Sequence, residues 1–371
     1  MTFQDPLDGV LQIAAANAVS VDRDARFPQE TVDALGDAGL LGLTLPTEIG
    51  GMGAGPVEFA QVVQQLASRC ASSAMVYLMH VCAATVTLAG TAGGDSPALR
   101  AMAGTGLSTL AFSERGSRSH FWAPVSQIAG TNGDARISAL KSWVTSAGHA
   151  DTYVVSTRPA GTESPIESSL YLVEASTNGI STDGPWIGLG LRGNASAPMT
   201  FDIAVSDGSL LGEDGKGLDL MLGVVLPWFQ LGQGAVSLGI AQGALGAAVT
   251  HVTGAKLEHL GQTLADLPTV RARIGRSQTE VDAIAGFLAD LARRMTEGDA
   301  QAPILSAKAA ANEMAIRVTS ESMQACGGAA MSPTLPVERF FRDARAGSVM
   351  APTTDVLYEL TGRALAGMPL L

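Results

Sequence analysis

The spacing of apolar residues changes twice along this 371-residue chain, and that change constrains the fold more than any other feature. Residues 7–45 and 56–104 carry apolar side chains at helical intervals. From about 107 to 212 the chain has short β-rich runs between clusters of Gly, Pro, Asn and Asp. Helical spacing returns at Gly217 and continues toward the end. The predicted order is therefore helical, then β, then helical.

This order predicts an N-terminal helical domain over 1–106, a middle β domain over 107–213 and a C-terminal helical bundle over 214–371. No internal repeat or long linker separates them, so we expect one cooperative unit. The β runs predict a compact antiparallel sheet or barrel. The predicted elements are strands near 153–155, 169–173 and 199–203, helices near 219–252, 266–296 and 302–326, and a short helix after Thr353.

Composition argues against several classes of function. The formal net charge is −12 and Lys and Arg form no basic block, so we expect neither a nucleic-acid partner nor an anionic membrane partner. The longest apolar stretches, around 218–250, are interrupted by polar residues, so no membrane span is predicted. Hydrophobic residues make up 46% of the chain but aromatic residues only 5%, which favours closely packed helices with small contact residues.

The cysteines indicate a reducing compartment. Cys70, Cys82 and Cys326 are odd in number and have neither CxxC nor Cys/His metal spacing. The first residues show no basic segment followed by an apolar core, so no secretory signal is expected. We therefore expect a cytoplasmic protein without a metal site.

Five stretches carry motifs that occur together, in this order, in one known family. The most specific is the last, Gln324-Ala325-Cys326-Gly327-Gly328 followed by Pro336-Val337-Glu338-Arg339-Phe340-Phe341-Arg342-Asp343-Ala344-Arg345. Residues 141–147 are close to a K-x-W-I-T motif, and residues 112–120 are a degenerate form of T-E-P-G-A-G-S-D. The remaining two stretches are 27–53 and 211–217. The set resembles the acyl-CoA dehydrogenase family across nearly the whole chain.

The resemblance implies an α+β fold that is mainly α, with an N-terminal helical domain, a middle β-barrel domain and a C-terminal four-helix bundle. It also implies an FAD cofactor and a homo-oligomer, either a dimer or a tetramer. In the family, a neighbouring subunit contacts FAD through a loop that corresponds to Gln324, Gly327 and Gly328. Glycines there let backbone N–H groups approach a polar ligand closely. The alternative is a tight turn between two helices.

Trp143 and Thr145 are the residues that best suit a flavin. Alternate residues of an extended strand point to the same face, so the indole and the hydroxyl are predicted to address one ligand together. A flavin needs an apolar wall beside its ring system and donors near its polar edge. The family resemblance implies the same roles. The alternative is a half-buried strand tryptophan with a threonine neighbour.

Other predicted cofactor contacts follow from the resemblance. Phe112, Ser113 and Ser119 match positions that line the flavin, although serines in such a turn can be turn formers only. Thr353 matches a threonine that contacts the pyrophosphate, at a helix start where N–H groups can hold phosphate. Asp355 is assigned to the same site and can otherwise cap the helix.

The family's usual catalytic base is missing. Dehydrogenation of an acyl thioester removes an α proton, which requires a carboxylate within reach. Where the family has the Glu of Y-E-G-T, this chain has Met350-Ala351-Pro352-Thr353. A second position used by some relatives falls near Phe229-Gln230, where neither residue is acidic. Asp355 and Glu359 on the terminal helix are candidate substitutes, and both can instead be solvated helix residues.

Three polar residues are assigned to the reaction site in place of the base. His80 and His120 lie in segments that border the acyl cavity in the family, and a neutral imidazole can both donate and accept a hydrogen bond. Each can otherwise be a satisfied core histidine. Gln230 can bind substrate or satisfy backbone within the bundle. Arg115 and Arg118 can bind an anionic substrate group or lie on the surface.

The sequence thus predicts an FAD-dependent oxidoreductase with a non-standard active site, acting on a small substrate such as an acyl thioester of CoA or acyl-carrier protein. Three alternatives remain open: a flavin monooxygenase or oxidase, a desulfinase-type elimination enzyme, and a catalytically incomplete partner subunit of a hetero-oligomer.

Overall fold

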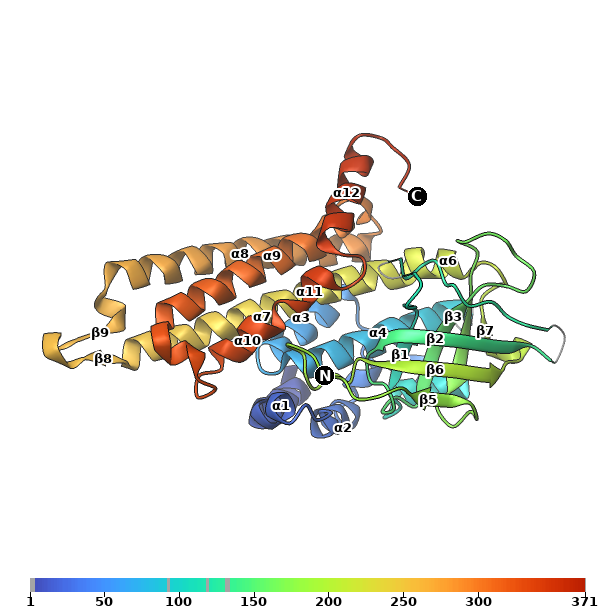
Figure 1. Cartoon of the computed structure of the whole chain (residues 1–371), viewed down its shortest axis with the longest axis horizontal. Coiled ribbons are helices and arrows are strands. Elements are labelled where there is room, and N and C mark those ends of the chain that lie inside the picture. Colours follow the sequence, from blue (N-terminus) through green and yellow to red (C-terminus); the bar gives the residue numbers. More distant parts are fainter. Residues whose placement is uncertain (1–3, 92–93, 118–119, 131–133, 371) are drawn as a thin grey trace. The chain divides into compact units, whose positions relative to one another are not determined.

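The computed structural model describes residues 4–370 except 92–93, 118–119 and 131–133 (Figure 1). The chain divides into two compact units, which are described separately. The first unit comprises Met1–Phe59, Met75–Ile187 and Arg192–Phe229. The second comprises Ala60–Ala74, Gly188–Leu191 and Gln230–Leu371. The helix–β–helix order of the sequence is confirmed.

The N-terminal region is helical, as predicted, but in shorter pieces. Its helices are α1 (Gln4–Arg23), α2 (Gln29–Asp37), α3 (Pro56–Ala67), α4 (Ala71–Gly90) and α5 (Pro97–Ala103). Between α2 and α3 the chain folds tightly, and a Cβ on Gly51 would lie 2.1 Å from the Leu45 carbonyl oxygen. Only glycine fits there, which explains why the helical spacing stops in this loop.

Two sheets form the middle of the first unit. One has the order β1-β3-β4-β7 and the other the order β2-β6-β5. The expectation of a purely antiparallel arrangement was wrong, because β1 and β3 pair in parallel. The intervening β2 belongs to the other sheet, so the chain returns to β3 in the same direction as β1. The strands are β1 (Ser108–Ala111), β2 (Arg136–Val144), β3 (Thr152–Thr157), β4 (Ser169–Glu174), β5 (Ile180–Thr182), β6 (Ala197–Ala204) and β7 (Leu210–Leu211).

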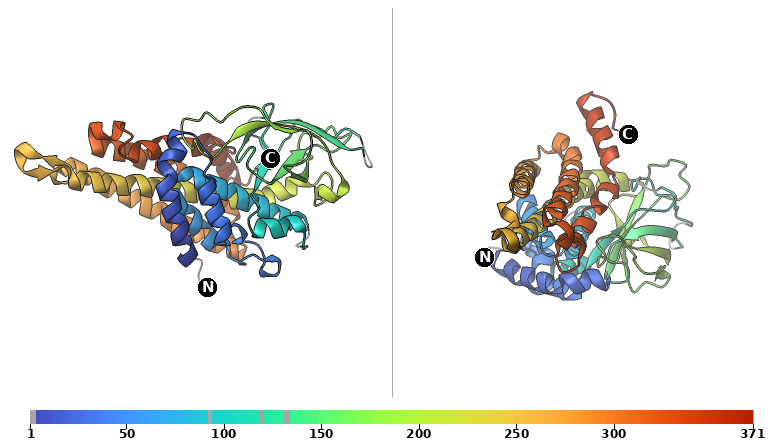
Figure 2. Two further views of the ribbon diagram at one scale, coloured as in Figure 1. Left: turned by 90° about the horizontal axis from the view of Figure 1, so that it is seen from below. Right: turned by 60° about the vertical axis from the view of Figure 1, so that its left-hand side comes forward.

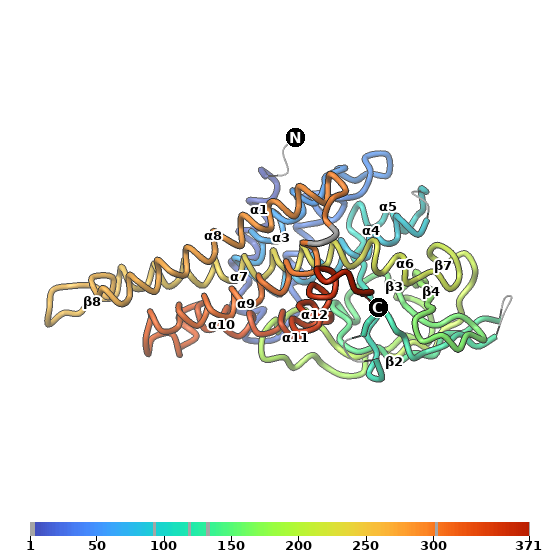
Figure 3. Tube along the Cα trace, turned by 90° about the horizontal axis from the view of Figure 1, so that it is seen from above, coloured from blue at the N-terminus to red at the C-terminus, as the bar shows by residue number. Residues whose placement is uncertain are grey.

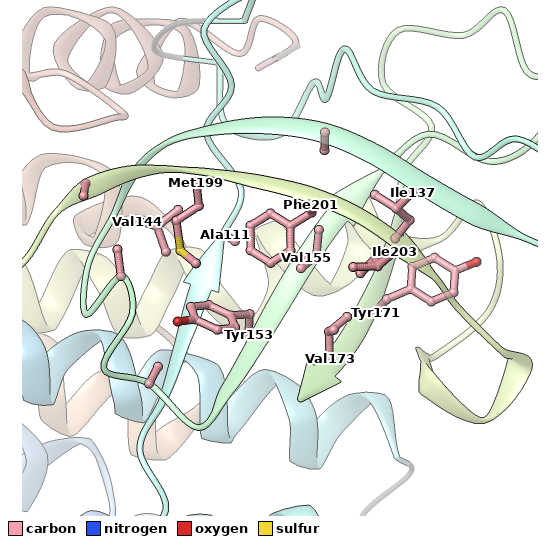
Figure 4. Packing of buried hydrophobic residues seen from close by; sticks show 14 of the residues in the cluster. Ala111, Ile137, Val144, Tyr153, Val155, Tyr171, Val173, Met199, Phe201 and Ile203 are labelled. Atoms are coloured by element: carbon pink, nitrogen blue, oxygen red, sulfur yellow. The ribbon is translucent and has the colours of Figure 1, made fainter. Parts of the chain in front are cut away.

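The two sheets share one hydrophobic core. Tyr153 and Val155 from β3 pack with Phe201 and Ile203 from β6, and all four are buried (Figure 4). The Tyr153 and Phe201 rings meet edge to face at 5.6 Å between centroids. The exposed and buried residues of β2 alternate up to Lys141, as expected for a sheet with one buried face.

The second unit is a helical bundle. Its long helices α7 (Leu226–Gly254, included from Gln230), α8 (Pro268–Glu297) and α9 (Gln301–Cys326) run side by side (Figures 1, 2 and 3). Three shorter helices contact α9: α10 (Val337–Asp343), α11 (Ala346–Val349) and α12 (Thr354–Leu365). A small hairpin, β8 (Lys256–Leu257) with β9 (Gln262–Thr263), joins α7 to α8 and was not predicted. A Cβ on Gly239 would lie 2.2 Å from the Gln64 carbonyl oxygen, so small residues do allow close packing in this unit.

Two helical segments, Ala71–Gly90 and Gly217–Gly254, are long and apolar enough to cross a membrane. The most apolar 18-residue part of each segment is largely buried inside the protein, 78% of it in Ala71–Gly90 and 61% in Gly217–Gly254. Such burial is characteristic of core helices in a folded domain.

Candidate functional site

A buried ion pair joins two of the motifs in the first unit. The Lys141 Nζ atom lies 2.6 Å from a Glu114 carboxylate oxygen, and both side chains are almost fully buried. Glu114 also accepts hydrogen bonds from the backbone N–H groups of Val125 and Ser126 and from the Ser126 hydroxyl. Lys141 donates further to the Ser156 carbonyl at 2.5 Å. The pair is therefore both ion-paired and hydrogen-bonded, as a buried charge requires.

The two partners respond differently to burial. Burial raises the pKa of Glu114, but the charge of Lys141 and hydrogen bonds from Lys141 and Ser126 outweigh this and lower the pKa below its usual value. Burial lowers the pKa of Lys141, and the Glu114 carboxylate opposes that shift. Glu114 is thus held as a carboxylate.

The ion pair brings the predicted flavin-contacting segments together. The Ser142 N–H donates to the Ser113 carbonyl at 2.8 Å, and Glu114 forms a β-bridge with Lys141. The Phe112 carbonyl accepts a longer hydrogen bond from Lys141 Nζ, at 3.4 Å. Residues 112–114 and 141–142 therefore form one local structure, although 27 residues separate Glu114 from Lys141. Sequence reasoning placed both segments in one site but missed the charge pair between them.

The prediction that Trp143 and Thr145 share one strand face was wrong. A β-bulge interrupts the pairing between Lys141 and Val144, and Trp143 has a φ of +57°. As a result the Trp143 side chain is 63% exposed, whereas Thr145 is buried and its hydroxyl lies 3.0 Å from that of Ser196. The exposed indole meets the Trp186 ring edge to face at 5.7 Å. Trp143 thus presents an uncovered aromatic surface, while Thr145 belongs to a buried hydroxyl pair.

The other residues predicted in this region have varied surroundings. Phe112 is buried and its ring stacks on Phe121 with centroids 6.3 Å apart. Ser113 is half-buried. His120 is exposed and its ring meets Trp122 edge to face. Ser119 lies outside the described residues, as does Arg118.

His80 is a structural residue rather than a catalytic one, which corrects the sequence-based assignment. Its Nε2 atom lies 3.0 Å from the Leu41 carbonyl oxygen, and its Nδ1 atom accepts a hydrogen bond from the Ser108 N–H at 3.1 Å. These contacts define a neutral imidazole with the proton on Nε2. The ring is fully buried, and burial lowers the pKa of His80 to about 4. Both nitrogens are committed to backbone, so the ring links α4 to two other segments.

In the second unit, the predicted oligomer loop is exposed. Gln324, Gly327 and Gly328 are all accessible at the end of α9. Gly327 has a φ of +63°, a left-handed conformation that favours glycine and ends the helix. A Cβ added to Gly327 or Gly328 would meet nothing within 4 Å. The loop therefore has room for a ligand or another chain to approach.

The start of α12 carries the predicted phosphate-binding residues. Thr353 is half-buried, and its side chain makes no capping hydrogen bond to the helix. The neighbouring Thr354 hydroxyl is buried and has no hydrogen-bond partner among the described residues. Asp355 is exposed in the first turn. The first N–H groups of the helix and the side chain of the half-buried Thr353 are thus the groups here that suit an anion.

The segment around Ala351, where the family resemblance implies the usual base, is fixed by a lysine that sequence reasoning did not identify. The Lys308 Nζ atom donates to the carbonyl oxygens of Gly347, Met350 and Pro352, at 2.9, 3.0 and 2.8 Å. Lys308 is fully buried, and burial lowers its pKa to about 7. Ala351 lies within this fixed segment and is half-buried. A lysine in the Ala-rich part of α9 was the available signal.

Gln230 is fully buried, and neither of its amide atoms has a hydrogen-bond partner among the described residues. The alternative prediction, that Gln230 hydrogen-bonds to backbone groups within the bundle, is therefore not observed. A buried amide without protein partners costs free energy, so the residue fits a binding role better than a packing role.

Comparison with known proteins agrees with this architecture. Domain profiles of the acyl-CoA dehydrogenase family match residues 9–112 (N-terminal domain), 109–204 (middle domain) and 215–366 (C-terminal domain). A probable acyl-CoA dehydrogenase of Mycobacterium leprae is 27% identical over 356 residues, covering 95% of this chain and 91% of the relative. A cyclohex-1-ene-1-carbonyl-CoA dehydrogenase of Syntrophus aciditrophicus is 27% identical over 362 residues, with 95% and 86% coverage.

The fold also matches solved structures. Butyryl-CoA dehydrogenase from Megasphaera elsdenii superposes with a TM-score of 0.89 at 24% identity, covering 99% of both chains. The chain belongs to the acyl-CoA dehydrogenase family and has its fold. It is an oxidoreductase with a flavin cofactor.

Replacing Lys141 with methionine is expected to destabilise the protein by about 3–5 kcal/mol, because Glu114 would be left as an unpaired buried carboxylate. Chemical denaturation measures this change. Arg136→Met is the matched control on the same strand, since Arg136 pairs with Asp202 in the open, and it should cost at most about 1 kcal/mol. Lys141→Met/Glu114→Gln should recover part of the loss. If Lys141→Met and Arg136→Met lowered stability equally, that result would contradict a structural role for the buried pair.

Acidification should destabilise the protein through His80. The folded-state pKa of about 4 lies below the unfolded value of 6.5, so the unfolded state binds more protons between these values and stability falls as the pH drops through them. Between pH 7 and pH 5 the loss due to His80 is expected to be about 2 kcal/mol. Urea unfolding at both pH values measures it, and a His80→Gln variant should lose less on acidification than the natural protein. The same loss in both would show that His80 does not titrate this way.

Proposed function

We propose that this chain is an FAD-dependent oxidoreductase that acts on an acyl thioester or a related small substrate through a modified active site. The observation that carries the proposal is the joining of two family motifs by the buried Lys141–Glu114 pair, which leaves the Trp143 indole exposed beside them. A flavin needs an apolar wall beside its ring system and donors near its polar edge. Ala351, in the place of the usual carboxylate, supports the modification.

The residues present suit an FAD molecule. Trp143 would supply the apolar wall. Thr145 and Ser196 carry two O–H groups, and the hydrogen bond between them uses only one as a donor, so the other can donate to the flavin. Ser113, Ser119 and Phe112 are proposed to line the same site. Thr353 and the first N–H groups of α12 are proposed to bind phosphate, and Asp355 is proposed to contact the cofactor through one of its O–H or N–H groups. Bound flavin supplies a two-electron acceptor.

The missing base shapes the proposed chemistry. Asp355 is exposed, and the Glu359 carboxylate accepts a hydrogen bond from Arg363, so neither is held as a buried general base. His120 and Gln230 remain as the polar residues proposed to meet the substrate, each able to donate and accept a hydrogen bond. A neutral site of this kind can orient the substrate through hydrogen bonds.

The absence of a carboxylate base also favours a second group of reactions. Flavin oxygenation or oxidation, and elimination such as desulfination, do not require the glutamate that Ala351 replaces. A catalytically incomplete subunit of a hetero-oligomer would tolerate the same loss. Reduction of the bound flavin by the purified chain separates these cases.

Substrate carrier, assembly and location are proposed from different observations. The Syntrophus aciditrophicus relative is named as an acyl-CoA dehydrogenase of a cyclic substrate, which supports a thioester of CoA or acyl-carrier protein. The exposed Gln324, Gly327 and Gly328 loop supports a homo-oligomer, dimer or tetramer, in which it reaches a neighbour's FAD. Three free, buried thiols, Cys70, Cys82 and Cys326, support a cytoplasmic location.

The purified chain should be yellow, and an acyl thioester added without oxygen should bleach its absorbance near about 450 nm. Chemical reduction by dithionite is the control that shows the bound flavin can be reduced. Colour that dithionite bleaches and no thioester bleaches would contradict dehydrogenation. Oxygen uptake by the reduced protein would then identify the oxygenase group, and a chain that binds no flavin by itself would favour the partner-subunit alternative.

A further inference from the structure

Three buried amide side chains gather in the second unit. Gln230 and Gln233 stand three residues apart on α7 and therefore on the same helical face. Asn312 on α9 reaches the same helix, because its Oδ1 atom accepts a hydrogen bond from the Ser237 hydroxyl at 2.7 Å. Gln230, Gln233 and Asn312, here called the amide cluster, are each at most 1% exposed.

The amide cluster retains unused hydrogen-bonding capacity. Both amide atoms of Gln230, the Oε1 atom of Gln233 and the Nδ2 atom of Asn312 have no hydrogen-bond partner among the described residues. By contrast, the Gln242 amide further along α7 accepts a hydrogen bond from Gln64 Nε2 at 2.9 Å. Each buried polar group without a partner costs about 1–3 kcal/mol. Several in one place are a cost that folding alone does not explain.

The amide cluster lies against the segment that contains Ala351. A Cβ on Gly347 would stand 2.3 Å from Asn312 Oδ1 and 3.0 Å from Gln233 Nε2, so both amides touch the backbone there. Lys308 fixes the same segment through its three hydrogen bonds to carbonyl oxygens. Position 351 is where the family pattern puts the group that acts on the substrate. The amides therefore adjoin a rigid segment of functional importance.

We propose that the amide cluster is a substrate subsite that binds an uncharged hydrogen-bonding group, a hydroxyl or a carboxamide, on the acyl chain. This inference rests on the proposed function and narrows its substrate class. The unused atoms include acceptors on Gln230 and Gln233 and donors on Gln230 and Asn312. The cluster itself carries no formal charge, and the Lys308 ammonium has one carbonyl acceptor for each of its N–H bonds. A cationic substrate group would lack a counter-charge, and an anionic one would find no free N–H on Lys308. A plain alkyl chain would leave the amides unsatisfied.

The stability of the ligand-free protein provides one test. Gln230→Met removes amide atoms that make no internal contact, so we expect the melting temperature to rise by about 1–3 °C. Gln242→Met is the matched control on the same helix, and it should lower the melting temperature because it breaks the pair with Gln64. A fall for Gln230→Met similar to that of the control would show that the Gln230 amide supports the fold, and would overturn the proposal.

Binding to the flavin-loaded full chain provides the second test. The probes are 4-hydroxybutanoyl-CoA and pentanoyl-CoA, which differ only by a terminal hydroxyl in place of a methyl group. The perturbation of the flavin spectrum measures both dissociation constants. We expect the hydroxyl probe to bind about tenfold more tightly to the natural protein, and Gln230→Met or Asn312→Leu to remove that preference.

The possible failures are distinguishable. Equal affinities for the two probes in the natural protein would overturn the subsite and leave the thioester function intact. Binding of neither probe would contradict the thioester function, and the melting temperatures of Gln230→Met and Gln242→Met would then decide the fate of the subsite alone.

Discussion

The first unit depends on a buried charge pair. Taking Lys141 and Glu114 out of water is costly, and the cost is offset only because each makes further hydrogen bonds. Together with the Ser142–Ser113 backbone hydrogen bond, those bonds tie residues 112–114 to residues 141–142. The bulge that follows turns Trp143 outward. The exposed indole and the buried hydroxyl of Thr145 thus follow directly after the segment that the ion pair holds.

A second buried lysine performs a similar task in the second unit. Lys308 has no carboxylate partner in its hydrogen bonds and is held by three backbone carbonyls. This arrangement orders the segment around Ala351 without placing an acid there. Beside it, the amide cluster offers neutral donors and acceptors. Under the proposed function, the chain keeps the family's fold and has a rigid, uncharged segment where the family resemblance implies a charged reaction group.

Sequence reasoning succeeded where local pattern determines structure. Helical and β periods predicted the main elements, because burial of one face repeats along each of them. It failed where tertiary contacts decide. The bulge after Lys141 places Trp143 and Thr145 in different surroundings, whereas they were expected on one strand face. His80 was predicted to be catalytic, but both of its ring nitrogens bind backbone groups. The Lys141–Glu114 pair and the Lys308 contacts join residues far apart in sequence, so no local pattern shows them.

The cofactor content of the purified protein tests the central claim most directly. Flavin released by denaturation can be identified by chromatography and counted against the protein concentration. The account predicts about one FAD per chain, and loss of most of it in a Trp143→Ala variant that remains folded. A chain that retains no FAD after incubation with excess cofactor, or a Trp143→Ala variant that retains all of it, would contradict the account.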